Sequence, residues 1–323
     1  MTLQKQKQEK MHQNPYKISH EPVLLTETLD LLKPQPGDRY LDVTAGYGGH
    51  AQAVMARSGN YAESVLVDRD AQAIKELKAR FSNQEIEIVK SDYLNESRKL
   101  LTKQYRFDLI LADLGVSSPH LNEVSRGFSF NNDGPLDMRM DQSQEVNAWQ
   151  VVNKFSEADL ADILWRYGEE PKSRQIARLI VRSRPLNSTA DLAAIAHKAW
   201  PGYSRSNPAT RTFQAIRVAV NNELDQLSEA LPVWLELLAP NGRLAIISFH
   251  SLEDRIVKRF MVEKSGNRYD SELILLTKHP LTAGEQEIAH NPRSRSAKLR
   301  VAAKQTTEGN ANADSGKKQL PGL

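Results

Sequence analysis

The chain has 323 residues, of which 40% are hydrophobic, and a formal net charge of +3. It contains no cysteine and no H-x-x-x-H or H-E-x-x-H spacing, which excludes disulfides, a cysteine nucleophile and the usual zinc motifs, so we expect no metal. No apolar run of about 20 residues occurs, and the Lys- and Gln-rich start is no signal peptide, so we expect a cytoplasmic protein without a membrane anchor.

The first third of the chain predicts alternating helices and strands. Residues 1–18 are an expected disordered tail, and leucines at helical spacing predict a helix over 23–32 that Lys33-Pro34 ends. From Arg39 to Asp113 short apolar strands alternate with helical segments. This alternation predicts a parallel sheet with crossover helices.

A glycine-rich turn at 46–49 follows the first expected strand and leads into a helix that opens near His50. Glycines permit a tight turn and let backbone N–H groups approach a ligand at the start of a helix. The turn also fits the G-x-G-x-x-A pattern of NAD enzymes. Asp42 would repel a pyrophosphate but suits a cationic amino acid, which favours S-adenosylmethionine over NAD.

An aspartate stands at or just past the end of four successive expected strands. This edge of an open α/β sheet is where ligands bind. Asp68, about 20 residues after the glycines, is placed to accept both ribose hydroxyls of a nucleoside cofactor. Each aspartate alone could instead be a turn or N-cap residue. Four aspartates at the same edge of the sheet as the glycine turn favour a ligand site. They are Asp42, Asp68, Asp92 and Asp113.

The alternation stops after Asp113, and residues 121–212 contain a loop and short amphipathic helices without a strand. We interpret them as an inserted helical domain. The loop at 126–141 is dense in charge and aromatic side chains, and we interpret it as a lid over the active site. The alternative is a surface loop held by Phe128 and Phe130. The expected helices span 149–154, 157–167, 173–183 and 190–200.

Basic residues favour a nucleic-acid partner. Arg174, Arg178 and Arg182 lie at i, i+4 spacing on one face of a helix, which could also be an ordinary solvated face. Arg211 belongs to a polar-aromatic turn expected over 207–214. Near the C-terminus, a basic run suited to phosphates contains Arg293 and Arg295.

The remaining elements return to the sheet. We expect a helix over 224–238, a strand over 242–248, a helix over 252–262 with Ser251 as its N-cap, and a closing antiparallel pair over 273–278 and 298–302. Residues 304–323 are an expected disordered tail. Asp113 and His250 lie at the carboxyl edge of the sheet, and we predict that they are catalytic, because a carboxylate there could accept an N–H of an amine.

Residues 19–301 resemble one family, the bacterial small-subunit (16S) ribosomal RNA cytosine-N4-methyltransferases. The resemblance implies an α/β fold, a Rossmann-like class I S-adenosylmethionine-dependent methyltransferase sheet with an inserted all-helical substrate-recognition domain. It implies methyl transfer to N4 of one cytosine in the decoding region. The most specific stretches are 20–25, 46–50, 113–119, 126–130 with 133–141, 207–217 and 246–260.

On this resemblance, residues 19–120 and 213–303 form the methyltransferase domain and residues 121–212 the RNA-recognition insertion. Small-subunit ribosomal RNA is the implied partner, free or within the small subunit, and a homodimer stays open. The alternatives are the same chemistry on another RNA, an NAD-dependent oxidoreductase and a non-catalytic RNA-binding module. The implied cofactor contacts are Gly48, Gly49, His50, Asp68, Tyr93, Asp113 and His120.

Overall fold

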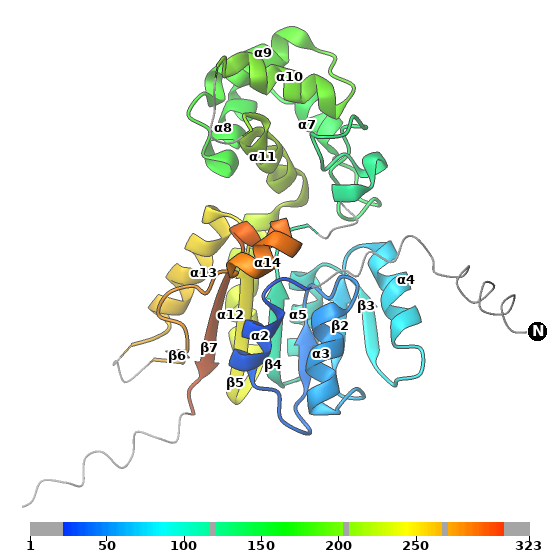
Figure 1. Cartoon of the computed structure of the whole chain (residues 1–323), viewed down its shortest axis with the longest axis vertical. Coiled ribbons are helices and arrows are strands. Elements are labelled where there is room, and N and C mark those ends of the chain that lie inside the picture. The colour runs from blue at the N-terminus through cyan, green and yellow to red at the C-terminus, as the bar shows by residue number, and fades with distance from the viewer. Residues whose placement is uncertain (1–21, 117–120, 203–206, 267–270, 307–323) are drawn as a thin grey trace, which may run out of the picture.

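The computed structural model describes residues 22–116, 121–202, 207–266 and 271–306. They form a helix-covered sheet and a helical unit, which stands above the carboxyl ends of the parallel strands in Figure 1. We call these parts the sheet unit and the helical unit. Within the described residues, the helices are all too short or too polar to cross a membrane.

Seven strands form one sheet in the order β3-β2-β1-β4-β5-β7-β6. The first five strands are parallel, and β7 runs antiparallel to both β5 and β6, which confirms the Rossmann-like sheet and its closing antiparallel pair. The strands are β1 Tyr40–Asp42, β2 Val65–Asp68, β3 Glu87–Lys90, β4 Phe107–Asp113, β5 Leu238–Ser248, β6 Leu273–Leu275 and β7 Lys298–Lys304.

Helices cover both faces of this sheet because its central strands are apolar on both sides. One face packs against α2 Leu25–Leu32, α3 Gly49–Ser58 and α4 Ala71–Arg80. The other face packs against α5 Tyr93–Thr102, α12 Glu223–Leu237 and α13 Ser251–Glu263. Two short elements, α14 Glu285–His290 and η3 Pro292–Ser296, lead into the last strand.

The helical unit has its own apolar core, to which the loop at 126–141 contributes Phe128, Leu136, Met138 and Met140. The expected helices between 149 and 200 are confirmed to within one or two residues. The elements of the unit are η2 Val124–Arg126, α7 Ala148–Lys154, α8 Glu157–Gly168, α9 Ser173–Ser183, α10 Thr189–Ala199 and α11 Ala209–Asn221.

Several sequence expectations need correction. The segment expected to be a turn at 207–214 mostly belongs to helix α11. The helical conformation buries Thr212 and Phe213. This helix crosses the expected domain boundary at 212/213 and packs in the core of the helical unit as far as Val220. Strand β5 begins at Leu238 rather than at 242, and β7 extends to Lys304, where we expected a tail. The expected tails otherwise lie outside the described residues.

Candidate functional site

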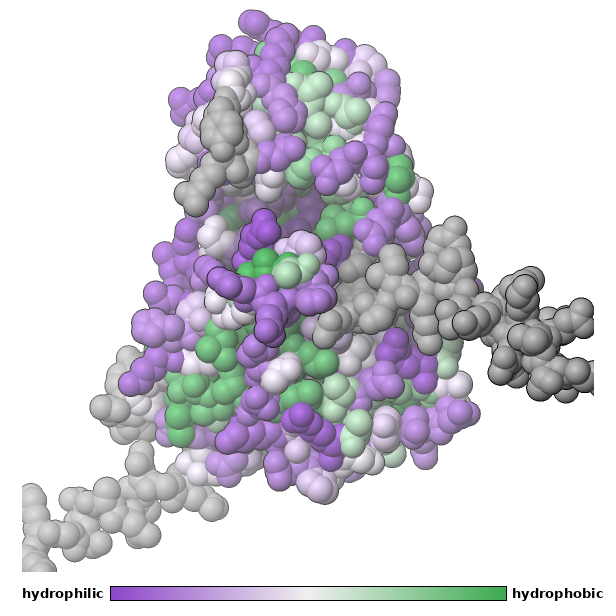
Figure 2. Space-filling model, viewed as in Figure 1, coloured by the Kyte–Doolittle hydropathy of each residue, from purple (hydrophilic) through white to green (hydrophobic). Residues whose placement is uncertain are grey.

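A cavity of about 450 Å³ lies at the carboxyl ends of β1, β2, β4 and β5, and side chains of both units line it. Figure 2 shows a recess between the two units on the face in view. Residues of the sheet unit that line the cavity include Gly46, Asp68, Tyr93 and Asp113, whereas the helical unit contributes Phe130, Phe213 and Arg217. The cavity therefore lies where the sequence placed the site, at the carboxyl edge of the sheet.

The glycines of the turn have different roles. Gly46 has a φ of 52° and lines the cavity, so a ligand can approach its backbone. Gly48 faces away from the cavity, because a Cβ there would lie 2.9 Å from the side chains of Leu77 and Phe81. A Cβ at Gly49 would lie 2.5 Å from Pro22. Gly48 thus allows close packing of α3 on α4, and since it is not among the residues that line the cavity, its role as a cofactor contact stays a prediction.

Two of the four strand-end aspartates, Asp42 and Asp92, have hydrogen bonds that stabilise the protein itself. Asp42 is only 2% exposed and accepts a hydrogen bond from the Tyr40 hydroxyl at 2.7 Å, and burial raises its pKa to about 7. It is not among the residues that line the cavity. Asp92 caps α5 by accepting from the Asn95 N–H at 2.9 Å, the alternative that the sequence left open.

Asp68 borders the cavity and is held by the backbone around it. Its two carboxylate oxygens accept the N–H groups of Gly46 and Asp70, each at 2.8 Å. A carboxylate offers about four lone-pair sites, and such a group at the cavity edge suits the hydroxyls of a ribose. This geometry supports the ribose-binding prediction.

Tyr93 provides an aromatic wall that the protein fixes in place. Its ring packs edge-on against Trp234 with 5.5 Å between centroids, and its hydroxyl donates to the Glu223 carbonyl at 3.2 Å. Burial raises the pKa of this hydroxyl, so it stays protonated near neutral pH. A fixed ring at the cavity wall suits stacking against an adenine.

Asp113 ends β4 and faces the cavity, with 27% of its side chain exposed. Its carboxylate Oδ2 lies 3.6 Å from Nδ1 of His50, and its Oδ1 is buried without a hydrogen-bond partner. Burial, with the nearby charges of Asp42 and Glu253, raises the pKa of Asp113 to about 8. The structure therefore brings His50 and Asp113 together, whereas His120 lies outside the described residues.

His250 also lines the cavity, but its main contacts are structural. It is the N-cap of α13 in place of the expected Ser251, because its Nδ1 accepts the Glu253 N–H at 3.4 Å. Glu253 in turn accepts the N–H groups of Phe249 and His250. Burial alone would raise the pKa of Glu253, yet its contacts with His250, the charge of Arg217 and the Phe249 N–H hold it below the usual range.

Sequence reasoning missed the charged network beside His250. Arg217 of α11 donates to both carboxylate oxygens of Glu223, at 2.9 and 2.8 Å. Ligand atoms of Glu223, His250 and Glu253 lie within 4.8 Å of one another, but a cation bound there would have to compete with this guanidinium. The acid three residues after His250, a capping-box pattern, was the available signal for Glu253.

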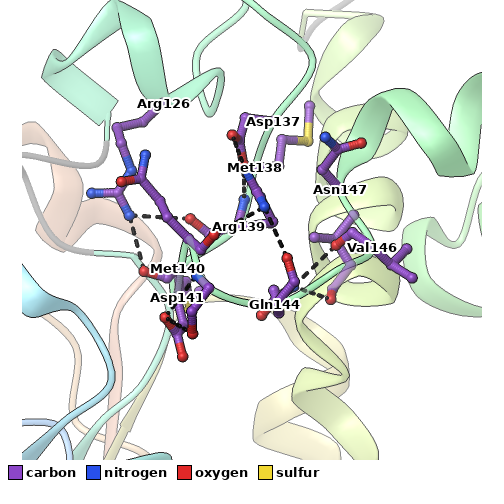
Figure 3. A network of polar contacts seen from close by, with 12 residues as sticks. Arg126, Asp137, Met138, Arg139, Met140, Asp141, Gln144, Val146 and Asn147 are labelled. Carbon is purple, nitrogen blue, oxygen red and sulfur yellow. Dashed lines mark hydrogen bonds and ion pairs between the residues drawn. The ribbon is translucent and has the colours of Figure 1, made fainter.

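The loop at 126–141 is fixed by buried hydrogen bonds (Figure 3). Arg126 pairs with Asp70 at 3.0 Å, both side chains being 7% exposed, and donates to the carbonyls of Arg139 and Met140. The Asn221 side chain adds bonds to the backbone of Met138 and Met140. The interpretation of the loop as a lid stays a prediction, since this structure shows a wall tied to both units.

The aromatic side chains of this loop combine the two roles that we considered. Phe128 and Phe130 line the cavity and also pack against the core of the helical unit. Phe130 meets Phe213 at 5.3 Å between ring centroids with an interplanar angle of 78°. Phe249, from the loop after β5, lines the cavity as well. Phe128, Phe130 and Phe249 therefore each offer a flat surface on which a ligand ring could stack.

The predicted RNA-binding arginines occupy different surroundings. Arg174, Arg178 and Arg182 are exposed on α9, at the end of the helical unit farthest from the sheet in Figure 1. Arg211 is exposed and donates to the Glu169 carbonyl at 3.1 Å. Arg295 is also exposed.

Arg293 differs from these arginines because it lines the cavity. Burial lowers the pKa of its guanidinium, and the charge of Asp113 opposes this effect. In this structure Arg293 therefore lies in the cavity wall near Asp113 rather than on the outer surface, and its contact with the RNA backbone stays a prediction.

Comparison with known proteins decides the family. The chain matches the MraW methylase family over residues 17–305. It belongs to that family. It is 46% identical over 297 residues to the ribosomal RNA small subunit methyltransferase H of Nostoc sp., covering 90% of this chain and 95% of that protein. The proteins of the same name from Heliobacterium mobile and Lawsonia intracellularis are 43% and 44% identical, over 88% of this chain and 98% and 99% of theirs.

One solved structure that the chain resembles is more distant in sequence. The N-methyltransferase NodS from Bradyrhizobium japonicum WM9, in complex with S-adenosyl-l-homocysteine, overlaps with a TM-score of 0.43 at 10% identity, covering 94% of this chain and 98% of that one. The assignment of this chain to the MraW methylases therefore rests on sequence.

Membership of the MraW methylase family makes this protein a methyltransferase with S-adenosylmethionine as its cofactor. The cavity fits that cofactor: its volume is within the range for small-molecule sites, and Asp68 and Tyr93 suit a ribose and an adenine. The buried Oδ1 of Asp113 lacks a donor that a cationic ligand could supply.

Proposed function

We propose that this MraW methylase transfers the methyl group of S-adenosylmethionine to N4 of a cytosine in the decoding region of small-subunit ribosomal RNA. The relatives are named for methylation of small-subunit ribosomal RNA, and they align over nearly their whole length. The observation that carries the choice of an amine is Asp113, a carboxylate at the end of β4 with a buried oxygen that has no partner.

An exocyclic amine needs such an acceptor. The lone pair of cytosine N4 is delocalised into the ring, and a carboxylate that accepts one of its N–H groups helps to free that pair for attack. S-adenosylmethionine supplies a methyl group already activated by the positive sulfur. Asp113 stabilises the positive charge that develops on the amine, and this stabilisation is greatest in the transition state.

The cavity walls would fix the geometry of the reaction. Asp68 and Tyr93 hold the cofactor on the sheet side, while Phe130, Phe213 and Phe249 offer flat surfaces for a base on the other. Methyl transfer requires the amine, the methyl carbon and the sulfur in line, so precise positioning supplies much of the rate enhancement. His250 caps α13 and thereby positions the loop that carries Phe249.

RNA would approach from the open side of the cavity, where the helical unit projects. The exposed arginines of α9 and Arg211 are available for backbone phosphates, and such contacts position RNA without reading its sequence. The assembled small subunit, rather than free RNA, would place one cytosine in reach of so recessed a cavity. A homodimer is compatible with this proposal, which does not depend on it.

The test is methyl transfer from labelled S-adenosylmethionine into free small-subunit ribosomal RNA and into small ribosomal subunits that lack the modification. Digestion to nucleosides should recover the label as N4-methylcytidine, more efficiently from subunits, and nuclease fragments of the RNA should carry the label at a single position. Recovery of the label in another nucleoside, or in an RNA outside the small subunit, would contradict the proposed site of methylation.

A further inference from the structure

His50 is held in one tautomer by the backbone. Its Nε2 lies 3.0 Å from the carbonyl oxygen of Val23, and a carbonyl oxygen can only accept a hydrogen bond. The proton of a neutral imidazole must therefore be on Nε2. Nδ1 then carries a lone pair, and this lone pair is on the side of the ring that faces Asp113.

Without another proton, this arrangement would be repulsive. Nδ1 of His50 and Oδ2 of Asp113 are 3.6 Å apart, so two lone pairs would face each other across a buried gap. The second oxygen of Asp113, Oδ1, is buried and has no hydrogen-bond partner, so an ionised carboxylate would be poorly stabilised. A single proton on either Nδ1 or Asp113 turns the contact into an attractive one.

We propose that His50 and Asp113 hold one proton between them in the free protein, and that binding of the cationic methyl donor expels this proton and leaves Asp113 ionised. The inference rests on the proposed function, because it assigns the ionised carboxylate to the amine of the substrate. It gives His50 the role of a positioning residue, which acts on the reaction through Asp113.

The charges around the pair agree with this assignment. Asp42 lies on β1 behind Asp113, Glu253 lies on α13, and the positive charge of Arg293 on η3 faces the same carboxylate. Burial and the two acids together raise the pKa of Asp113 to about 8, with Arg293 opposing them, so the pair keeps a proton near neutral pH. A ligand that brings positive charge into the cavity reverses this balance.

The protons taken up and released in one catalytic cycle then balance. The pair releases one proton to solvent when the donor binds. At the chemical step the lone pair of the amine forms the new N–C bond, the bond between methyl carbon and sulfur breaks, and its electrons stay on sulfur. The amine then loses a proton to Asp113, which restores the starting state of the pair. One proton is released to solvent for each methyl group transferred.

Calorimetry of the full chain with S-adenosylmethionine tests this inference without any turnover. Titrations near neutral pH in two buffers of different ionisation enthalpy give the number of protons released on binding, which should be about one. Asp113→Asn should abolish the release. His50→Gln, which keeps an N–H donor for the Val23 carbonyl, should reduce it.

Asp68→Asn is the matched control, since it alters a cavity acid that already accepts two backbone N–H groups. This variant should bind the donor more weakly yet release the same number of protons. Two results would overturn the inference and leave the donor assignment standing. One is a binding enthalpy of the unaltered protein that does not depend on the buffer, and the other is undiminished proton release by Asp113→Asn. Absence of any binding heat would instead contradict the donor assignment and the inference with it.

Discussion

The charged side chains around the cavity and those on the outer helical unit behave as two different sets. The side chain of Arg126 is 7% exposed and donates hydrogen bonds to Asp70 and to two backbone carbonyls. The side chain of Arg178 is 57% exposed, and its ion pair with Glu157 is looser, with 3.6 Å between nitrogen and oxygen. The first kind joins the two units and shapes the cavity. The second kind is free to exchange water and ions for a phosphate backbone. The same residue type thus lies in two different surroundings, and burial separates them.

The largest effect should come from breaking the buried pair between the units. Arg126→Gln removes the guanidinium from Asp70 and from the loop carbonyls, which should lower the free energy of unfolding by about 3–5 kcal/mol. Denaturant unfolding measures this loss. Arg178→Gln is the exposed counterpart and should change stability by less than about 1 kcal/mol. Equal losses in both variants would remove the distinction between the two sets.

A second effect concerns the buried Asp42 and its dependence on pH. Its pKa is about 7 in the folded protein and near 3.8 in the unfolded chain, so the folded state binds more protons between these values. Stability should therefore fall as the pH rises from about 4 to about 7, by up to ~4 kcal/mol for a shift of about three units.

Asp42→Asn cannot ionise but keeps an acceptor for the Tyr40 hydroxyl, so it should remove this part of the pH dependence. Unfolding midpoints measured across the same pH range test the prediction. An unchanged slope in the variant would show that Asp42 is ionised in the folded protein at low pH as well.

The donor side of the cavity should show a smaller and more local effect. Asp68→Asn keeps one acceptor oxygen but loses the charge offered to the ribose hydroxyls, which should weaken binding of S-adenosylmethionine by about 1.5–3 kcal/mol. Calorimetry measures the affinity, and thermal unfolding verifies the fold. Full affinity in the variant would refute the ribose assignment.

The exposed arginines should have the smallest effect on stability, within about 0.5 kcal/mol. Replacing Arg174, Arg178 and Arg182 by Gln should flatten the salt dependence of RNA binding by roughly one unit of log–log slope for each phosphate that the variant no longer neutralises. Donor affinity should not change. An unaltered slope would make α9 a solvated face. The matched control replaces three exposed arginines of the sheet unit, Arg57, Arg98 and Arg106.

The sequence predicted the part of the site that is built from local patterns. Asp68 and Asp113 follow apolar strands, and the geometry of parallel sheets places such residues at one edge, whereas Tyr93 was expected only from the family resemblance. The glycine turn identified the start of α3, although the direction in which Gly48 faces depends on α4, which no local pattern reveals.

The rest of the site depends on packing between segments far apart in the chain. Arg217 and Glu253 reach the cavity from α11 and α13, and their roles arise only when these helices pack beside the sheet. Arg293 reads as part of a basic surface run, yet η3 directs it into the cavity. The sequence did not predict the start of helix α11, because Asn207-Pro208 is typical of a turn. Burial of Phe213 in the folded protein favours the helix there instead.

The central claim is that Asp113 acts in methyl transfer and not merely in holding the donor. Asp113→Asn preserves the shape of the side chain and removes its charge, and the direct measurement is the single-turnover rate of this variant at saturating S-adenosylmethionine and saturating small subunits. The account predicts a rate about 10²–10³-fold below that of the unaltered protein, the range for removal of one preorganised electrostatic interaction. An unchanged saturated rate, accompanied only by weaker donor binding, would contradict it.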